Sequence, residues 1–161
     1  MIFPKKLKKT LKPKKVSVKP KKPKKRKKHY KTGVYISKKC IEPVLYRSGW
    51  ELVYAKYLDV EPTVKSFKYE SFSIPYVANF STGKIRHYIP DFLVEYNDGK
   101  QVLVEIKRDD KVTNRKVQKK YAAAKVWCGS RNIEHFILTS KDIEQIKKTY
   151  NITDENDTWY V

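Results

Sequence analysis

Hydrophobic and polar residues follow a pattern across residues 88–107 that predicts a β-hairpin. One apolar run covers residues 92–96 and a second covers residues 102–106, with Asn97-Asp98-Gly99-Lys100 between them. Apolar, β-branched runs on both sides of an Asp-Gly turn are typical of two antiparallel strands joined by a tight turn. The second run is apolar at nearly every position, so we expect it near the middle of a sheet.

Helical periodicity appears in three other parts of the chain. Ser48 and Glu51 have the spacing of a capping box at the start of the first helix. A second helix is expected over residues 114–128, with one apolar and one lysine-rich face, and a third after Ser140. The buried face of the first helix should comprise Trp50, Val53, Tyr54, Tyr57 and Leu58.

These elements combine into an α/β fold with a mixed sheet. Residues 64–77 and 135–139 have the composition of further strands. The order is then helix, three antiparallel strands, helix, strand, helix. The last strand follows a helical crossover, so we expect it to run parallel to the strand before it. About 120 residues are enough for such a core.

Charge divides the chain into two parts. Residues 1–30 hold 15 of the 37 Lys and Arg residues and no Asp or Glu, which leaves a surplus of only five positive charges in the rest. Four prolines in this stretch disfavour helix, and the charges repel one another. We therefore expect residues 1–38 to be a disordered basic tail and residues 39–161 to be the folded domain.

The tail has the composition of an arm that binds DNA phosphates. A solubilising extension and an address signal are the alternatives. The residues expected to contact DNA are Lys24, Lys25, Arg26, Lys27 and Lys28.

Other features exclude some classes of protein. Cys40 and Cys128 provide neither a metal-ligand spacing nor a disulfide framework, which fits a reducing compartment. No apolar run approaches the length of a membrane span, and no hydrophobic stretch follows the first lysines as in a secretory signal. We therefore expect no membrane partner.

Candidate chemistry lies on the predicted hairpin. Glu105 and Lys107 are two residues apart in a strand and should project from the same face. Asp91 follows Pro90 at the start of the neighbouring strand and can lie beside them. Two carboxylates and an amine suit metal-assisted hydrolysis of a phosphodiester. The alternative is an ordinary solvated ion pair.

These residues also carry a family resemblance. Pro90-Asp91 followed by Glu105-Ile106-Lys107 resembles the PD-(D/E)xK nuclease motif. The segment Tyr46-Arg47-Ser48-Gly49-Trp50-Glu51-Leu52 resembles the opening helix of the head-completion nucleases of T-even-type phages, and related transposon-end endonucleases share a Ser-x-x-Glu helix of this kind. The resemblance implies a restriction-endonuclease-like core.

The resemblance further implies a magnesium site with one or two ions, for which Mn²⁺ can substitute. Its ligands would be Glu51, Asp91, Glu105 and the backbone carbonyl of Ile106, and Lys107 would act on the attacking water. Glu70 is a further candidate carboxylate. Capping is the alternative role of Glu51, and a structural or solvated role is the alternative for Glu70.

The expected function is that of a Mg²⁺-dependent deoxyribonuclease that processes packaged phage DNA so that the head can be completed and joined to the tail. Its partners would be double-stranded DNA and phage portal or neck proteins, in the host cytoplasm during assembly or in the virion. A non-catalytic DNA-binding plug and a transposition or repair endonuclease are the alternatives. On the folded part, the residues expected to contact DNA are Arg86, Lys116 and Lys120.

Overall fold

A four-stranded mixed sheet with helices on both faces forms the body of the protein. The computed structural model describes residues 31–155. The sheet has the order β1-β4-β5-β6, in which β1 pairs with β4 and β4 with β5 antiparallel, while β6 is parallel to β5. Its strands are β1 (Val64–Tyr69), β4 (Phe92–Tyr96), β5 (Gln101–Ile106) and β6 (Glu134–Leu138). The expected α/β class, the Asp-Gly hairpin and the parallel final strand are confirmed.

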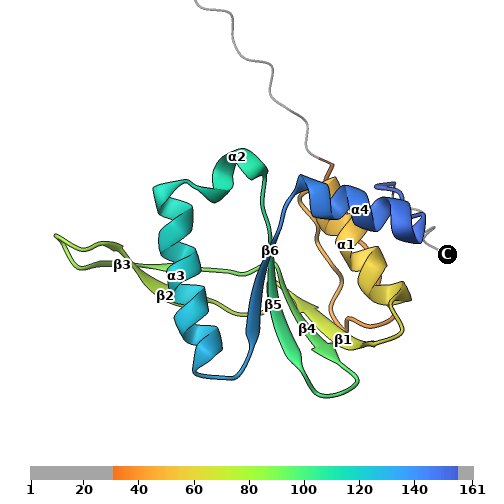
Figure 1. Cartoon of the computed structure of the whole chain (residues 1–161), viewed down its shortest axis with the longest axis horizontal. Coiled ribbons are helices and arrows are strands. Elements are labelled where there is room, and N and C mark those ends of the chain that lie inside the picture. The colour runs from red at the N-terminus through yellow and green to blue at the C-terminus, as the bar shows by residue number, and fades with distance from the viewer. Residues whose placement is uncertain (1–30, 156–161) are drawn as a thin grey trace, which may run out of the picture.

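The helices cover the sheet from two sides (Figure 1). Helices α1 (Gly49–Val60) and α4 (Ser140–Tyr150) pack together on one face. Helix α3 (Arg115–Gly129) lies on the other face, and the short helix α2 (Asp109–Val112), which the sequence did not suggest, precedes it.

Strand β5 contributes to a separate hydrophobic core on each face. Val102, Val104 and Ile106 belong to the core beneath α1 and α4, whereas Leu103 belongs to the core beneath α3. Because successive strand residues point to opposite faces, Glu105 shares the side of Leu103. Alternation therefore directs Glu105 towards the α3 layer.

A second hairpin, which the sequence analysis missed, projects from the body. The stretch 64–77 is not one strand: β1 ends at Tyr69, and β2 (Ile74–Asn79) pairs with β3 (Lys84–Tyr88) in a separate two-stranded sheet. Its base is buried through Ile74 and Tyr88 in the α3 core. Figure 1 shows its far end extending beyond the α3 layer.

The helix ends follow the capping chemistry of the sequence with small shifts. Ser48 caps α1 by accepting from the backbone N–H of Glu51 at 3.2 Å, and Asn114 caps α3 by accepting from Lys116. Thr139, rather than Ser140, is the cap of α4, and it forms a capping box with Asp142. At the end of α3, Val126 is exposed and Trp127 packs against the core.

The segment before α1 is packed against the body. Tyr35 forms an isolated antiparallel bridge with Val44 and is buried, and its hydroxyl donates to Asp59 at 2.7 Å. The expected boundary between tail and domain at residue 38 therefore falls inside a packed segment. None of the helices among residues 31–155 is long and apolar enough to cross a membrane.

Candidate active site

Asp91 is held against the end of β5 by the register of the β4–β5 hairpin. Phe92 pairs with Val104, so one further step along the antiparallel register brings Asp91 opposite Glu105. The backbone N–H of Ile106 donates to Asp91 Oδ2 at 2.7 Å. The backbone of Asp91 is fixed as well, because its carbonyl accepts from the N–H of Glu70 at 2.9 Å.

Among residues 31–155, Glu105 is the only charged residue that is buried, with 2 % of its surface exposed. Its Oε2 accepts from the hydroxyl of Tyr88 at 2.8 Å, and its Oε1 lies 3.0 Å from Lys107 Nζ. Both contacts place the carboxylate on the α3 side of the sheet. The same-face projection of Glu105 and Lys107 is therefore present in the structure.

Electrostatic coupling joins Asp91 to the other acidic candidates. Removal from water raises the pKa of Asp91 well above its ordinary value, and the negative charges of Glu105 and Glu51 add to this effect. The hydrogen bond from Ile106 and the charge of Lys107 act in the opposite direction without cancelling it. The site thus holds neighbouring carboxylates that a nearby positive charge would stabilise.

Lys107 remains a cation in this environment. Burial by itself lowers the pKa of its amine, but Glu105, Asp91 and Glu51 outweigh that effect, so the pKa lies above its ordinary value. Lys107 is half-buried. At neutral pH its ammonium is therefore a fixed positive charge beside Glu105.

Glu51 reaches this region from α1, and its carboxylate is already engaged. It accepts from the backbone N–H of Arg47 and from the hydroxyl of Tyr69, both at 2.7 Å, and from Ser48 Oγ at 2.9 Å. The bonds from Arg47 and Ser48 satisfy hydrogen-bond donors at the start of α1, as expected if Glu51 is a capping residue. Glu51 also lines the same depression as Lys107.

Glu70 is directed elsewhere. It follows β1 with a positive φ of 43° and forms an ion pair with the exposed Arg47. Its link to the site is its backbone N–H, which supports the backbone of Asp91.

The donor set fits a magnesium ion that keeps part of its water shell. Among residues 31–155, no group of three or more His, Cys, Asp and Glu side chains is close enough to hold one metal ion. Magnesium, however, is usually bound by one or two carboxylates together with water and substrate phosphates. Asp91 and Glu105 supply two such carboxylates. The pKa of Asp91 is raised first by burial and then by the negative charge of Glu105, and a bound cation would offset both effects.

Basic residues line a depression that adjoins the carboxylates through Lys107. Arg86, His87, Lys116 and Lys120 line one depression together with Lys107, and no acidic residue contributes to that lining. This arrangement brings the three candidate DNA contacts of the folded part together beside the site. The five candidates in the tail, residues 24–28, lie outside the described residues.

Tyr88 is a site residue to which the sequence gave no role. Its position three residues before Asp91 was visible, but its contact with Glu105 depends on how β3 approaches β5, and no local pattern specifies that approach. Burial raises the pKa of Tyr88, and the adjacent Glu105 raises it further, so its hydroxyl remains a donor. Tyr69 was missed in the same way as the donor to Glu51.

Replacing Tyr88 with phenylalanine should lower the free energy of unfolding by about 1–3 kcal/mol, because a buried carboxylate oxygen would lose its donor. Denaturant unfolding in EDTA measures the effect. Tyr76→Phe on the same hairpin is the matched control, since the Tyr76 hydroxyl forms no hydrogen bond with residues 31–155, and it should change stability by less than about 0.5 kcal/mol. Equal stabilities of the two variants would refute this role of Tyr88.

Comparison with known proteins agrees with the motif-based resemblance. Residues 61–140 match the family model described as TnsA-like endonuclease N terminal, a range that contains Asp91, Glu105 and Lys107 but not Glu51. Over 64 residues the chain is 34 % identical to the head completion nuclease of Enterobacteria phage T4. That match covers 40 % of this chain and 42 % of the relative, so the chain spans about two fifths of the length of that relative.

Proposed function

We propose that this protein is a Mg²⁺-dependent deoxyribonuclease of the PD-(D/E)xK type. The match of residues 61–140 to the TnsA-like endonuclease N-terminal family supports this proposal. The observation that carries the proposal is the position of Asp91 opposite the buried Glu105, with the Lys107 ammonium 3.0 Å from that carboxylate. Two carboxylates and a cation at the end of one β-hairpin suit hydrolysis of a phosphodiester.

Asp91 and Glu105 would hold the metal ion, with the carbonyl of Ile106 as a further oxygen ligand and Glu51 as the candidate from α1. The ion, when bound, would supply Lewis acidity and a more acidic water. Mn²⁺, which also takes oxygen ligands, should substitute for Mg²⁺.

The remaining groups of the site would position the reactants. Lys107 is protonated, so it would orient the attacking water by donating to it and would stabilise the negative charge that develops on the phosphate oxygens. Tyr88 holds one oxygen of Glu105, and the N–H of Ile106 holds one oxygen of Asp91, so both carboxylates are fixed before substrate binds. Such preorganisation reduces the reorganisation needed during the reaction.

Nicking of supercoiled plasmid tests this function. Wild-type protein should convert the plasmid to open-circular or linear forms in Mg²⁺ and should leave it intact in EDTA. Asp91→Ala should be inactive, and Lys107→Ala should nick the plasmid at least about 100-fold more slowly than wild type. Equal nicking by all three proteins, or nicking by wild type in EDTA, would remove the assignment.

The biological setting we propose is late phage assembly. The support is the match to a protein whose name is head completion nuclease. The substrate would then be double-stranded DNA that protrudes from, or is packaged in, the head, and the partners would be portal or neck proteins. Host cytoplasm during assembly, and then the virion, are the corresponding locations.

A second candidate is a DNA-binding head-completion protein without catalysis. Two observations favour it: the Glu51 carboxylate is occupied by capping hydrogen bonds, and no three-ligand group exists within the described chain. Calorimetry separates the two candidates, because a non-catalytic plug should show no Mg²⁺ binding that depends on Asp91.

A further inference from the structure

The β2–β3 hairpin is anchored along α3 and leads away from the active site. At its base, the Tyr88 hydroxyl donates to Glu105, so β3 ends beside the carboxylate of the proposed site. Farther out, Lys119 Nζ of α3 donates to the carbonyl of Ala78 in β2 at 2.7 Å. The hairpin is therefore a fixed extension of the site (Figure 1).

Three surface depressions share residues and form one continuous track. The first lies beside α1 and includes Glu51, Lys107 and Lys111. The second contains Lys107 and Lys111 again, and continues to Arg86 and Lys116. The third contains Arg86 and Lys116 again and reaches the outer part of the hairpin at Lys84 and Asn79. Lys107 thus lies where the track passes the active site.

The outer part of this track is positively charged and uncompensated. No acidic residue lines the second and third depressions. Within the described chain, Lys84, Arg86 and Lys116 form no ion pair, whereas Lys111 contacts Asp110 nearer the site. Uncompensated cations in a row suit a polyanion better than a protein partner with mixed charge.

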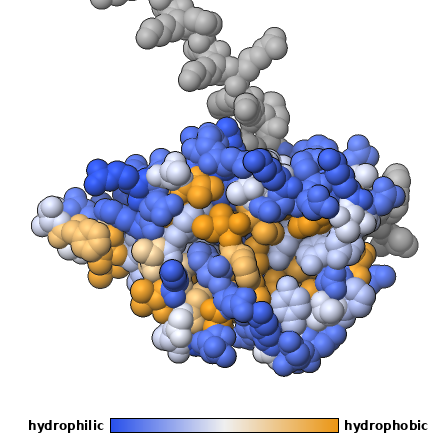
Figure 2. All heavy atoms as spheres, in the orientation of Figure 1, coloured by the Kyte–Doolittle hydropathy of each residue, from blue (hydrophilic) through white to orange (hydrophobic). Residues whose placement is uncertain are grey.

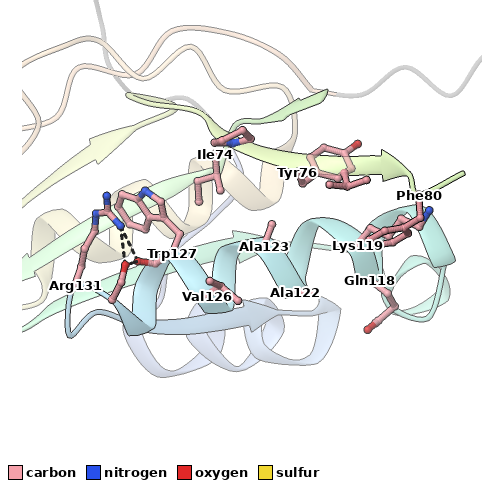
Figure 3. A pocket seen from close by; sticks show the side chains of 13 residues that line it. Ile74, Tyr76, Phe80, Gln118, Lys119, Ala122, Ala123, Val126, Trp127 and Arg131 are labelled. Carbon is pink, nitrogen blue, oxygen red and sulfur yellow. Dashed lines mark hydrogen bonds between the residues drawn. The ribbon is translucent and has the colours of Figure 1, made fainter. Parts of the chain in front are cut away.

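An exposed aromatic residue follows β2 at the turn of the hairpin. Phe80 is 76 % exposed, and Lys119 Nζ lies 5.2 Å from its ring centroid. Figure 3 shows Phe80 beyond the last residues of β2, beside Lys119. Ile85 on the paired strand is 63 % exposed, and Figure 2 shows hydrophobic surface at this end of the molecule next to hydrophilic surface. Proteins that kink a duplex insert apolar side chains of this kind between base steps, next to cationic side chains that bind the DNA.

We propose that the β2–β3 hairpin and the first half of α3 form an arm that binds double-stranded DNA beside the cleavage site. Lys84, Arg86 and Lys116 contact phosphates along the track, and Phe80 inserts against a base step at the far end. This inference rests on the proposed function for the identity of the substrate. It adds the path of the duplex and a residue that contacts bases.

The experiment uses the full chain and a short duplex in EDTA, where cleavage is absent. Fluorescence anisotropy gives the dissociation constant as a function of salt for wild type, for Arg86→Ala/Lys116→Ala and for Lys68→Ala/Lys148→Ala. The last variant is the matched control, since both of its lysines are exposed on β1 and α4 and line none of the three depressions. The arm variant should reduce the slope of log K against log salt by about 2, and the control by much less.

A second measurement isolates Phe80. Duplexes that carry 2-aminopurine at successive positions should show, with wild type, one position of increased fluorescence where a step is unstacked. Phe80→Ala should abolish that increase and weaken binding about 5-fold to 100-fold, whereas Phe80→Leu, which keeps an apolar wedge, should retain both.

The outcomes separate this inference from the proposed function, because plasmid nicking in Mg²⁺ is measured on the same proteins. The arm is overturned, and the nuclease assignment is left intact, if wild type nicks DNA but the arm and control variants have the same salt slope. The same holds if wild type nicks DNA but the fluorescence increase does not depend on Phe80. Slopes and fluorescence as expected, without nicking by wild type, support the arm and overturn the nuclease assignment.

Discussion

Lys107→Ala is expected to reduce the rate of Mg²⁺-dependent DNA cleavage by about 10²-fold to 10³-fold, the usual cost of removing one preorganised group that stabilises developing charge. The ammonium lies 3.0 Å from Glu105 and is held in the charged form by the surrounding carboxylates. Its loss therefore removes a fixed cation from the place where the phosphate would gain negative charge. Single-turnover cleavage of a labelled duplex measures the rate.

Lys111→Ala is the matched control for this prediction. Lys111 lines both depressions next to Lys107, but it is exposed and contacts Asp110 rather than Glu105 or Asp91. It should lower the rate less than about 10-fold, because screened surface charges contribute little. If Lys107→Ala and Lys111→Ala slow cleavage equally, Lys107 acts as part of the general positive surface and not in the reaction.

Mg²⁺ is expected to stabilise wild-type protein and to leave Asp91→Asn unaffected. A ligand that binds only the folded state adds about 2.7 kcal/mol to stability when its concentration is 100-fold above its dissociation constant. Asparagine keeps an oxygen that can accept from the N–H of Ile106, so the local structure should survive while the charge is lost. Thermal unfolding with Mg²⁺, and with NaCl at equal ionic strength, measures the difference.

In EDTA the same substitution should stabilise the protein. The pKa of Asp91 is raised in the folded state, so its contribution to stability is fully present below the unfolded pKa, about 3.9, and is lost as pH rises through the folded pKa. Above that pH an ionised Asp91 beside Glu105 costs stability, which Asp91→Asn removes. Lower stability of Asp91→Asn than of wild type in EDTA at pH 7 would contradict this account of the site.

The parts of the site that local pattern determines could be predicted from the sequence. Period-two alternation was sufficient to place Glu105 and Lys107 on one face, and the Asp-Gly turn was sufficient to bring Asp91 opposite Glu105. Both inferences need only neighbours within one hairpin. The order β1-β4-β5-β6 was predicted nearly as well, because a helical crossover implies a parallel strand.

The features that sequence did not reveal depend on contacts between distant segments. The break after β1 was missed because residues 64–77 remain rich in aromatic and β-branched residues, and no glycine marks the break. The roles of Tyr88 and Tyr69 follow from how their strands approach the carboxylates in space. The role of Glu51 could not be predicted for a different reason: a capping box and a metal site would both place a glutamate at this position, so the sequence does not distinguish them.

Anomalous scattering from crystals of the full chain soaked in Mn²⁺ would locate the cation itself. We expect a peak within about 2.5 Å of carboxylate oxygens of both Asp91 and Glu105, and no such peak in crystals of Asp91→Asn. A wild-type map without a peak between these two carboxylates, at a Mn²⁺ concentration that supports cleavage, would contradict this expectation.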